Sequence, residues 1–178
     1  MAEQPFNLDT YKCVNFTGKL WRVTHSSSQS HWDRSTFHMV AANDPGTFPN
    51  KASLKEAVEA HIDWKSRKTS PFLSVFSDEG HARQWALWRN PPVYIHEIDT
   101  THLPTGPSIL LDMEVLMAEL KIKHEFPKHE LLFLHRIPYG LIKTSETLLG
   151  KSDPDRPYAQ SVPLQWESPG VGTRGAPA

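Results

Sequence analysis

Three residues of this 178-residue chain, Arg22, Ser74 and Glu130, have side chains suited to chemistry at a phosphorylated sugar. A guanidinium offers phosphate oxygens planar, charge-assisted hydrogen bonds that a lysine ammonium does not reproduce. A carboxylate beside a sugar stabilises the positive charge that develops as a glycosidic bond breaks. Each of these residue types alone is common at solvated strand edges, so the elements around them decide their significance.

The segments around Arg22 and Glu130 are predicted to be strands whose ends meet loops. Residues 20–23 combine β-prone and aromatic side chains before a serine-rich turn, which places Arg22 near the open end of a strand. Residues 129–137, HELLFLHRI, are predicted as one long strand that Glu130 opens and Pro138 ends. Both side chains are therefore expected at the edge of a sheet.

Ser74 lies in a third predicted strand, PFLSVFSD. Alternation along a strand places Phe72, Ser74 and Phe76 on one face, so the hydroxyl is flanked by two aromatic rings. These rings offer a stacking face for a planar ligand ring. We expect Ser74 to orient a ligand rather than to attack it.

Two helices are predicted on either side of this strand. Residues 50–64 have apolar side chains at helical spacing, with Ser53 as the expected N-cap and Glu56 as its capping-box partner. Asp78 is expected to cap a helix over residues 79–88, which an Asn-Pro-Pro sequence ends.

The remaining periodic segments complete the expected fold. Trp85 and Trp88 recur at helical spacing and are predicted to pack in the core rather than to bind a cofactor. Residues 110–122, LLDMEVLMAELKI, are predicted as a further amphipathic helix, and residues 93–99 and 140–148 as strands.

Composition limits the class of protein. The net charge is -1 and the pI is about 6.8, so no overall basic field indicates a nucleic-acid or membrane partner. The single cysteine, Cys13, has no partner for an internal disulfide, and the chain opens without the pattern of a signal peptide. No apolar run approaches the ~20 residues that span a bilayer. These features predict a soluble, intracellular protein, and we expect it in the cytoplasm.

Apolar periodicity divides the chain into three parts. Residues 1–15 are predicted to be an N-terminal arm, and residues 16–150 one α+β domain. From residue 151 to residue 178, proline, glycine, serine and charge replace the periodic pattern, which predicts a mostly disordered tail.

Three sequence stretches in order, LWRV, SPFLSVFSDEGHARQWA and KHELLFLHRIPYGLI, resemble the mono-ADP-ribosyltransferases of the Arg-Ser-Glu class. That class has an aromatic-Arg strand, then a Phe-x-Ser-x-x-Ser strand between helices, and then a catalytic Glu before an apolar strand that ends in Ile-Pro. The resemblance covers roughly residues 20–142. The stretch from WKSR to SPFLSVFSD also resembles an uncharacterised group of small fungal domains.

The resemblance implies a fold of two small packed antiparallel sheets with flanking helices and an NAD cleft between the sheets. It implies that NAD is the substrate and that Glu130 is catalytic, with Arg22, Ser74, Phe72 and Phe76 binding the dinucleotide. The implied reaction transfers ADP-ribose to a macromolecular or small-molecule acceptor, or releases it to water.

One position departs from the pattern of this class. Two residues before the catalytic Glu, members that modify arginine have another Glu and several others a Gln, whereas this chain has Lys128. The usual acceptor-activating residue is therefore missing, which leaves NAD hydrolysis, an unusual acceptor or a degenerate site as alternatives. Glu125 and His129 lie close enough in sequence to substitute for it.

Other readings of the sequence stay open beside this one. The fold could serve a non-catalytic interaction module, or an enzyme that reuses the cleft for a different substrate. The basic stretch at residues 64–68 could contact the phosphates of NAD or of a nucleic acid. We expect no metal site, because His124 and His129 are separated by a proline and no His-Glu-x-x-His sequence is present.

Overall fold

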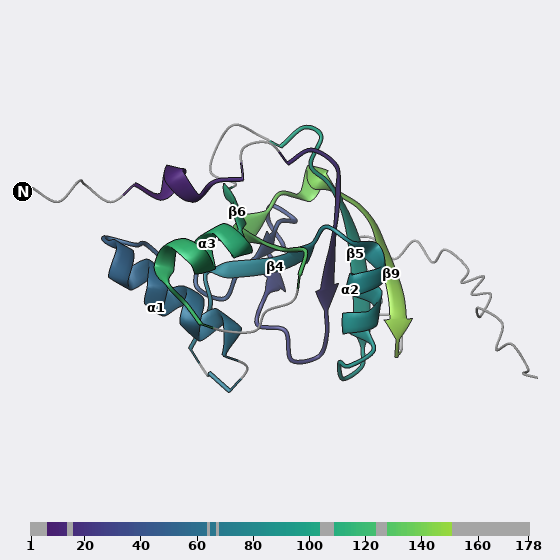
Figure 1. The fold of residues 1–178 in the computed structure, drawn as a ribbon. Coiled ribbons are helices and arrows are strands. Elements are labelled where there is room, and N and C mark those ends of the chain that lie inside the picture. The colour runs from purple at the N-terminus through teal and green to yellow at the C-terminus, as the bar shows by residue number, and fades with distance from the viewer. Residues whose placement is uncertain are drawn as a thin grey trace, which may run out of the picture.

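The computed structural model describes residues 7–13, 16–63, 65–66, 68–103, 109–123 and 128–150. Within these residues the chain forms an α+β fold of two antiparallel sheets and three α-helices, as the sequence predicts at this level (Figure 1). The tail predicted from residue 151 onward lies outside the described residues.

The larger sheet has six strands in the order β6-β7-β4-β1-β5-β9, and the smaller has three in the order β2-β3-β8. The strands of the larger sheet are β1 Lys19–Thr24, β4 Phe72–Phe76, β5 Val93–Asp99, β6 Ile109–Asp112, β7 Glu130–Leu134 and β9 Ile142–Leu149. Those of the smaller sheet are β2 His31–Trp32, β3 Met39–Val40 and β8 Arg136–Ile137.

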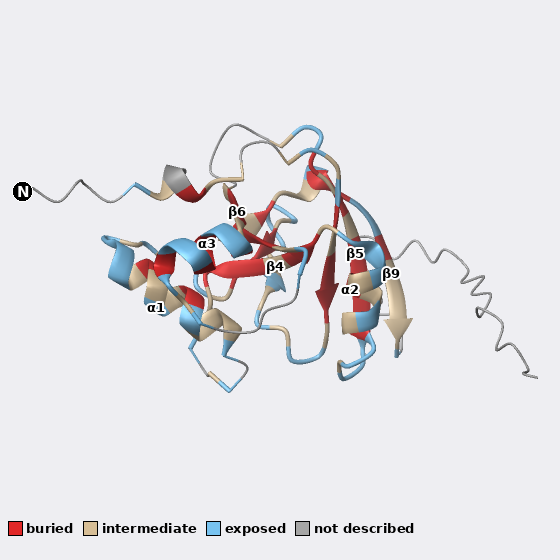
Figure 2. Cartoon of the chain, viewed as in Figure 1, coloured by how far each residue is buried: buried red, intermediate tan, exposed pale blue. Residues whose placement is uncertain are grey.

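The helices are α1 Lys51–Ile62, α2 Glu79–Ala86 and α3 Met113–Leu120, with short 3-10 turns at Leu8–Tyr11 and Tyr139–Leu141. In Figure 1, α1 and α3 lie together beside β4 and β6, and α2 lies beside β5 and β9. Strands β1, β4, β5 and β7 are buried along most of their length, β9 is mostly half-buried or exposed, and the outward sides of the helices are exposed (Figure 2).

Alternation along β4 divides the core into layers. Leu73 and Val75 are buried against the smaller sheet, in one cluster with Met39 and Ile137. A fully buried aliphatic side chain stabilises a fold by about 1.5–3 kcal/mol, so this alternation fixes which side of β4 faces the helices.

On the helix side of β4, the aromatic residues belong to two separate clusters. Phe72 packs with α1 and α3, and Phe76 packs with α2. Ser74 lies between them on the same face. The Ser74 hydroxyl therefore lies between the apolar cluster of α1 and α3 and the apolar cluster of α2, and neither cluster covers it.

Strands β1 and β4 are adjacent in the sheet but pair at one position only, Trp21 with Phe76. By contrast, β1 pairs with β5 along its full length, from Lys19 with Asp99 to Thr24 with Tyr94. The larger sheet is therefore divided at this point, and the two strands diverge beyond it.

The predicted N-cap of α1 and the predicted start of the helix at residue 110 are wrong. Asn50, not Ser53, is the N-cap of α1: its side chain accepts from the Ser53 backbone N–H, and Ser53 is the capping-box partner. Glu56 instead forms an ion pair with Lys68 at 2.6 Å. Residues 109–112 form strand β6, and the helix begins only after Asp112, which caps it.

The predicted long strand at residues 129–137 is interrupted. His135 adopts a positive φ of 67°, which ends β7 and turns the chain into β8 of the smaller sheet. Trp88, predicted in the core, is 81 % exposed, because α2 ends at Ala86 and the following turn directs the ring outward. The predicted cap at Asp78 is confirmed.

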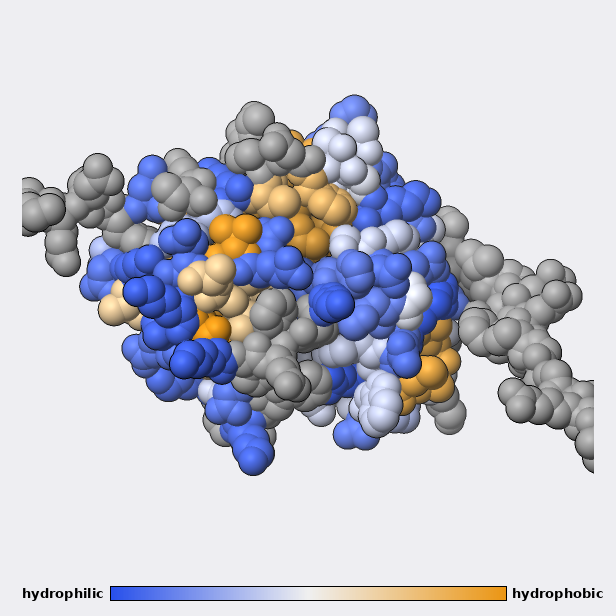
Figure 3. Space-filling view, in the orientation of Figure 1, coloured by the Kyte–Doolittle hydropathy of each residue, from blue (hydrophilic) through white to orange (hydrophobic). Residues whose placement is uncertain are grey.

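The face of the molecule in Figure 3 is mostly hydrophilic, with hydrophobic side chains in small separate patches. The large hydrophobic side chains that are exposed among the described residues are Phe37, Leu87, Trp88 and Val115. Within the same residues, no helix is long and apolar enough to cross a membrane.

Candidate functional site

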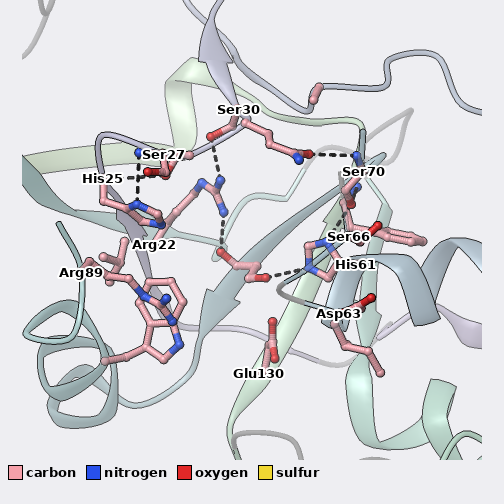
Figure 4. Close-up of a pocket in the computed structure, with 18 of the residues that line it drawn as sticks. Arg22, His25, Ser27, Ser30, His61, Asp63, Ser66, Ser70, Arg89 and Glu130 are labelled. Atoms are coloured by element: carbon pink, nitrogen blue, oxygen red, sulfur yellow. Dashed lines mark hydrogen bonds between the residues drawn. The ribbon is translucent and has the colours of Figure 1, made fainter. Parts of the chain in front are cut away.

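A cavity of about 510 Å³ opens where β1 and β4 diverge. It is bordered by these two strands, by the C-terminal ends of α1 and α2, and by the serine-rich loop after β1. The volume lies within the ~300–1,000 Å³ of typical small-molecule sites. Arg22, Ser74 and Glu130 all border it, so the structure brings the three predicted residues to one cavity (Figure 4).

The strand register explains why Glu130 lies near Ser74. Glu130 pairs with Phe76, and Ser74 pairs with Leu132. Paired residues of antiparallel strands share a face, so Glu130 and Ser74 are diagonal neighbours on the helix side of the sheet. The position of Glu130 is therefore set by the backbone of two central strands.

Arg22 reaches the cavity through the division between β1 and β4. Its side chain is 7 % exposed, and its guanidinium donates from Nη1 to the Ser74 carbonyl oxygen at 2.7 Å and from Nη2 to Ser30 Oγ at 2.8 Å. Nε lies 2.9 Å from Met39 Sδ. Burial lowers the pKa of Arg22 to about 10, and the charge of Glu130 opposes this shift. The guanidinium therefore stays charged at neutral pH.

Glu130 has a strongly perturbed acidity. Burial raises the pKa of its carboxyl from 4.5 to about 7, although a hydrogen bond from the Ser74 side chain and the charge of Arg22 both act to lower it. Desolvation is therefore the dominant cause. A carboxyl group with this pKa can exchange its proton near neutral pH, and any cation that enters the cavity favours its ionised form.

The two predicted stacking residues are covered by protein. Phe72 and Phe76 are 3 % and 2 % exposed, although both border the cavity. Phe72 stacks on Phe48 with ring centroids 5.7 Å apart, and Phe76 contacts Trp85 at 5.7 Å. Stacking of either ring on a ligand stays a prediction. In the structure the two rings pack against other aromatic side chains in the wall of the cavity.

His61 is a residue of the site that the sequence analysis missed. Its Nε2 lies 2.8 Å from Ser74 Oγ, and its Nδ1 lies 2.6 Å from Ser70 Oγ. Burial and the charge of Arg22 lower the pKa of His61 to about 4, so the ring is neutral at pH 7. The signal was its spacing: His61 follows the buried Val58 by three residues, on the face of α1 that meets the sheet.

A second arginine also borders the cavity. The Arg89 guanidinium carbon lies 3.5 Å from the centroid of the Trp85 ring, in a cation–π contact. Burial lowers the pKa of Arg89 to about 10. The exposed Trp88 borders the same end of the cavity, and His25 lies between Arg22 and Trp85. This end therefore combines cationic and aromatic side chains.

The residues before Glu130 are only partly described. Lys128 and His129 are exposed, and His129 has a positive φ of 70° with its ring 6.1 Å from that of His81. Glu125, the other expected substitute for an acceptor-activating residue, lies outside the described residues.

The basic stretch at residues 64–68 and the histidines are the remaining features that the sequence singles out. In the basic stretch, Trp64 and Arg67 lie outside the described residues, and Lys68 is paired with Glu56. No group of three or more His, Cys, Asp or Glu side chains within the part that the structure describes is placed to hold a metal ion.

This arrangement can hold an anion and a developing cation side by side. Arg22 and the serine-rich loop supply donors on one side of the cavity, and the Glu130 carboxyl lies opposite (Figure 4). Hydrogen bonds from charged donors are roughly twice as strong as neutral ones. A substrate with phosphates and a reacting sugar carbon suits such a pair.

No curated protein and no solved structure matches the chain. A family model described as a domain of unknown function, DUF7587, matches residues 16–149, and these include every residue of the cavity wall named above. The chain therefore belongs to the DUF7587 family.

Proposed function

We propose that this protein is an NAD-consuming enzyme of the ADP-ribosyltransferase type, in fold as well as in activity. It cleaves the bond between nicotinamide and ribose and passes the ADP-ribosyl group to an acceptor or to water. The observation that supports the proposal best is the meeting of Arg22, Ser74 and Glu130 on one cavity, in the chain order that this class of enzyme uses.

In the proposed reaction the C–N bond between the ribose and nicotinamide breaks, and nicotinamide leaves with the bonding electron pair. The ribose becomes oxocarbenium-like, and the Glu130 carboxylate stabilises its positive charge. An acceptor nucleophile or water then attacks the same carbon and loses its proton to solvent. Arg22 holds the pyrophosphate, and Ser74 orients Glu130.

The raised pKa of Glu130 fits this role. Burial keeps the carboxyl partly protonated near pH 7. The nicotinamide ring of NAD is a cation, and an adjacent cation favours the ionised carboxylate. Substrate binding therefore prepares the charge that the transition state needs. Because desolvated charges interact strongly, this effect is larger in the cavity than in water.

The proposal is tested by isothermal titration of the protein with NAD, together with chromatographic detection of free nicotinamide, with and without candidate acceptors. We expect heat of binding and nicotinamide above the uncatalysed rate. If wild-type protein gives neither, the enzyme proposal fails and the non-catalytic interaction module takes its place.

A further inference from the structure

Ser70, His61 and Ser74 form a short chain of hydrogen bonds beside Glu130. Ser70 Oγ lies 2.6 Å from His61 Nδ1, and Ser74 Oγ lies 2.8 Å from His61 Nε2. Ser74 and Glu130 are diagonal neighbours on the paired strands β4 and β7, and both border the cavity. The direction of each proton in this chain decides whether Ser74 can donate to Glu130.

Ser70 has a hydroxyl proton that can be donated to His61. Ser70 Oγ accepts a hydrogen bond from the backbone N–H of Phe72 at 3.1 Å. Its own proton is free to donate to Nδ1 of the neutral imidazole. A neutral imidazole has one N–H, so when Ser70 donates to Nδ1 the hydrogen is on Nε2 and is donated to Ser74 Oγ.

The ionised form of Glu130 leads to the same assignment. An ionised carboxylate only accepts hydrogen bonds, so a Ser74 hydroxyl that bonds to it is the donor. A hydroxyl has one proton. Ser74 Oγ can therefore only accept from His61, which again requires hydrogen on Nε2.

We propose that His61 is a positioning residue that directs the hydroxyl proton of Ser74 at the Glu130 carboxylate. The catalytic consequence of this proposal rests on the function proposed above. His61 itself acts through Ser74, whose backbone carbonyl is fixed by Arg22 at 2.7 Å. The other tautomer would direct the Ser74 proton at His61 and leave Glu130 without this donor.

The first part of the experiment is done without substrate. Long-range ¹H–¹⁵N NMR of the wild-type protein identifies the tautomer of His61, and ¹³C-labelled glutamate carboxyls give the pKa of Glu130, assigned with Glu130→Gln. We expect hydrogen on Nε2. Hydrogen on Nδ1 at neutral pH would overturn the proposal.

Three single variants, and the double variant of His61→Met with Ser74→Ala, then measure the coupling through Ser74. His61→Met removes the donor at similar size, and we expect the pKa of Glu130 to rise by about one unit, a tenfold change in proton affinity. His61→Gln keeps an N–H donor and should stay near the wild-type value. Ser74→Ala should raise the pKa at least as much as His61→Met, and the double variant no further. Additive shifts in the double variant would contradict the proposal.

The activity readout distinguishes this proposal from the proposed function. In nicotinamide release, His61→Met should lower kcat more at pH 6.5 than at pH 8.5 with little change in KM for NAD, because Glu130 ionises at higher pH. Arg22, the charged group that acts on both His61 and Glu130, is unchanged in these variants, and Asp63 and Lys68, which border the same cavity, are exposed.

If the wild type releases no nicotinamide while the tautomer and the titrations are as expected, the proposed function fails and the positioning of Ser74 is upheld. If His61→Met does not fold, Ser70→Ala replaces it. That variant removes the donor to Nδ1, and it should also raise the pKa of Glu130 only when Ser74 is present.

Discussion

The Arg22 guanidinium donates to the carbonyl oxygen of Ser74 at 2.7 Å, across the point where β1 and β4 diverge. A backbone carbonyl that would otherwise face the division in the sheet is thus satisfied by a side chain. Arg22 is therefore part of the structure of the site as well as a candidate for phosphate binding.

We predict that Arg22→Lys lowers the free energy of unfolding by about 1–3 kcal/mol, because an ammonium cannot reproduce the forked contacts to Ser74 and Ser30. NAD binding should weaken about tenfold or more for the same reason. Urea unfolding and isothermal titration measure the two effects. Arg34→Lys is the matched control, because Arg34 is exposed. Unchanged binding in Arg22→Lys would argue against phosphate contact.

Glu130 and His61 are predicted to give opposite pH dependences of stability. The pKa of Glu130 is raised from 4.5 to about 7 in the folded protein, so its stabilising contribution is lost as pH rises from 4.5 to 7. The pKa of His61 is lowered from 6.5 to about 4, so its contribution is lost as pH falls from 6.5 to 4.

Single variants should separate the contributions of Glu130 and His61 to the pH dependence of stability. Relative to wild type, Glu130→Gln should gain stability as pH rises through 4.5–7, by about 3 kcal/mol. His61→Gln should gain stability relative to wild type as pH falls through 6.5–4. Urea unfolding at a series of pH values measures both differences, in which the other titrating groups cancel. A pH-independent difference for either variant would refute the corresponding pKa shift.

Trp88 is predicted to matter for binding and not for folding. It is 81 % exposed at the rim of the cavity, so Trp88→Ala should change the free energy of unfolding by less than about 0.5 kcal/mol. Trp85→Ala should cost about 2 kcal/mol or more, because Trp85 packs on Phe76. If Trp88 contacts the nucleotide, its removal weakens NAD binding in isothermal titration. Equal losses of stability in both variants would contradict the structure.

Local sequence patterns predict most of the strands. They do not predict which residues of different elements come into contact. The alternation in β4 correctly placed Ser74 beside Phe72 and Phe76, and the acidic cap at Asp78 was identified from its position alone. The site residue His61 could not be recognised this way, because its meaning depends on where the end of α1 meets β4.

The errors have similar physical causes. The apolar residues at 110 and 111 continue the helical pattern of the residues after them. Pairing of residues 109–112 with β7 overrides this local preference for a helix. Asn50 and Ser53 are both favourable N-cap residues, so the sequence pattern alone does not distinguish them. In the structure the helix begins directly after Asn50, which makes Asn50 the N-cap. Trp88 has helical spacing, but α2 stops before it.

Nicotinamide release by Glu130→Gln, compared with wild type and with the exposed control Glu114→Gln, tests the central claim most directly. The amide keeps the shape of the side chain and removes the charge that opposes the oxocarbenium ion. We expect cleavage to fall by about 10²- to 10³-fold, while NAD binding by titration is largely preserved and Glu114→Gln behaves as wild type. Cleavage by Glu130→Gln at the wild-type rate would contradict the account.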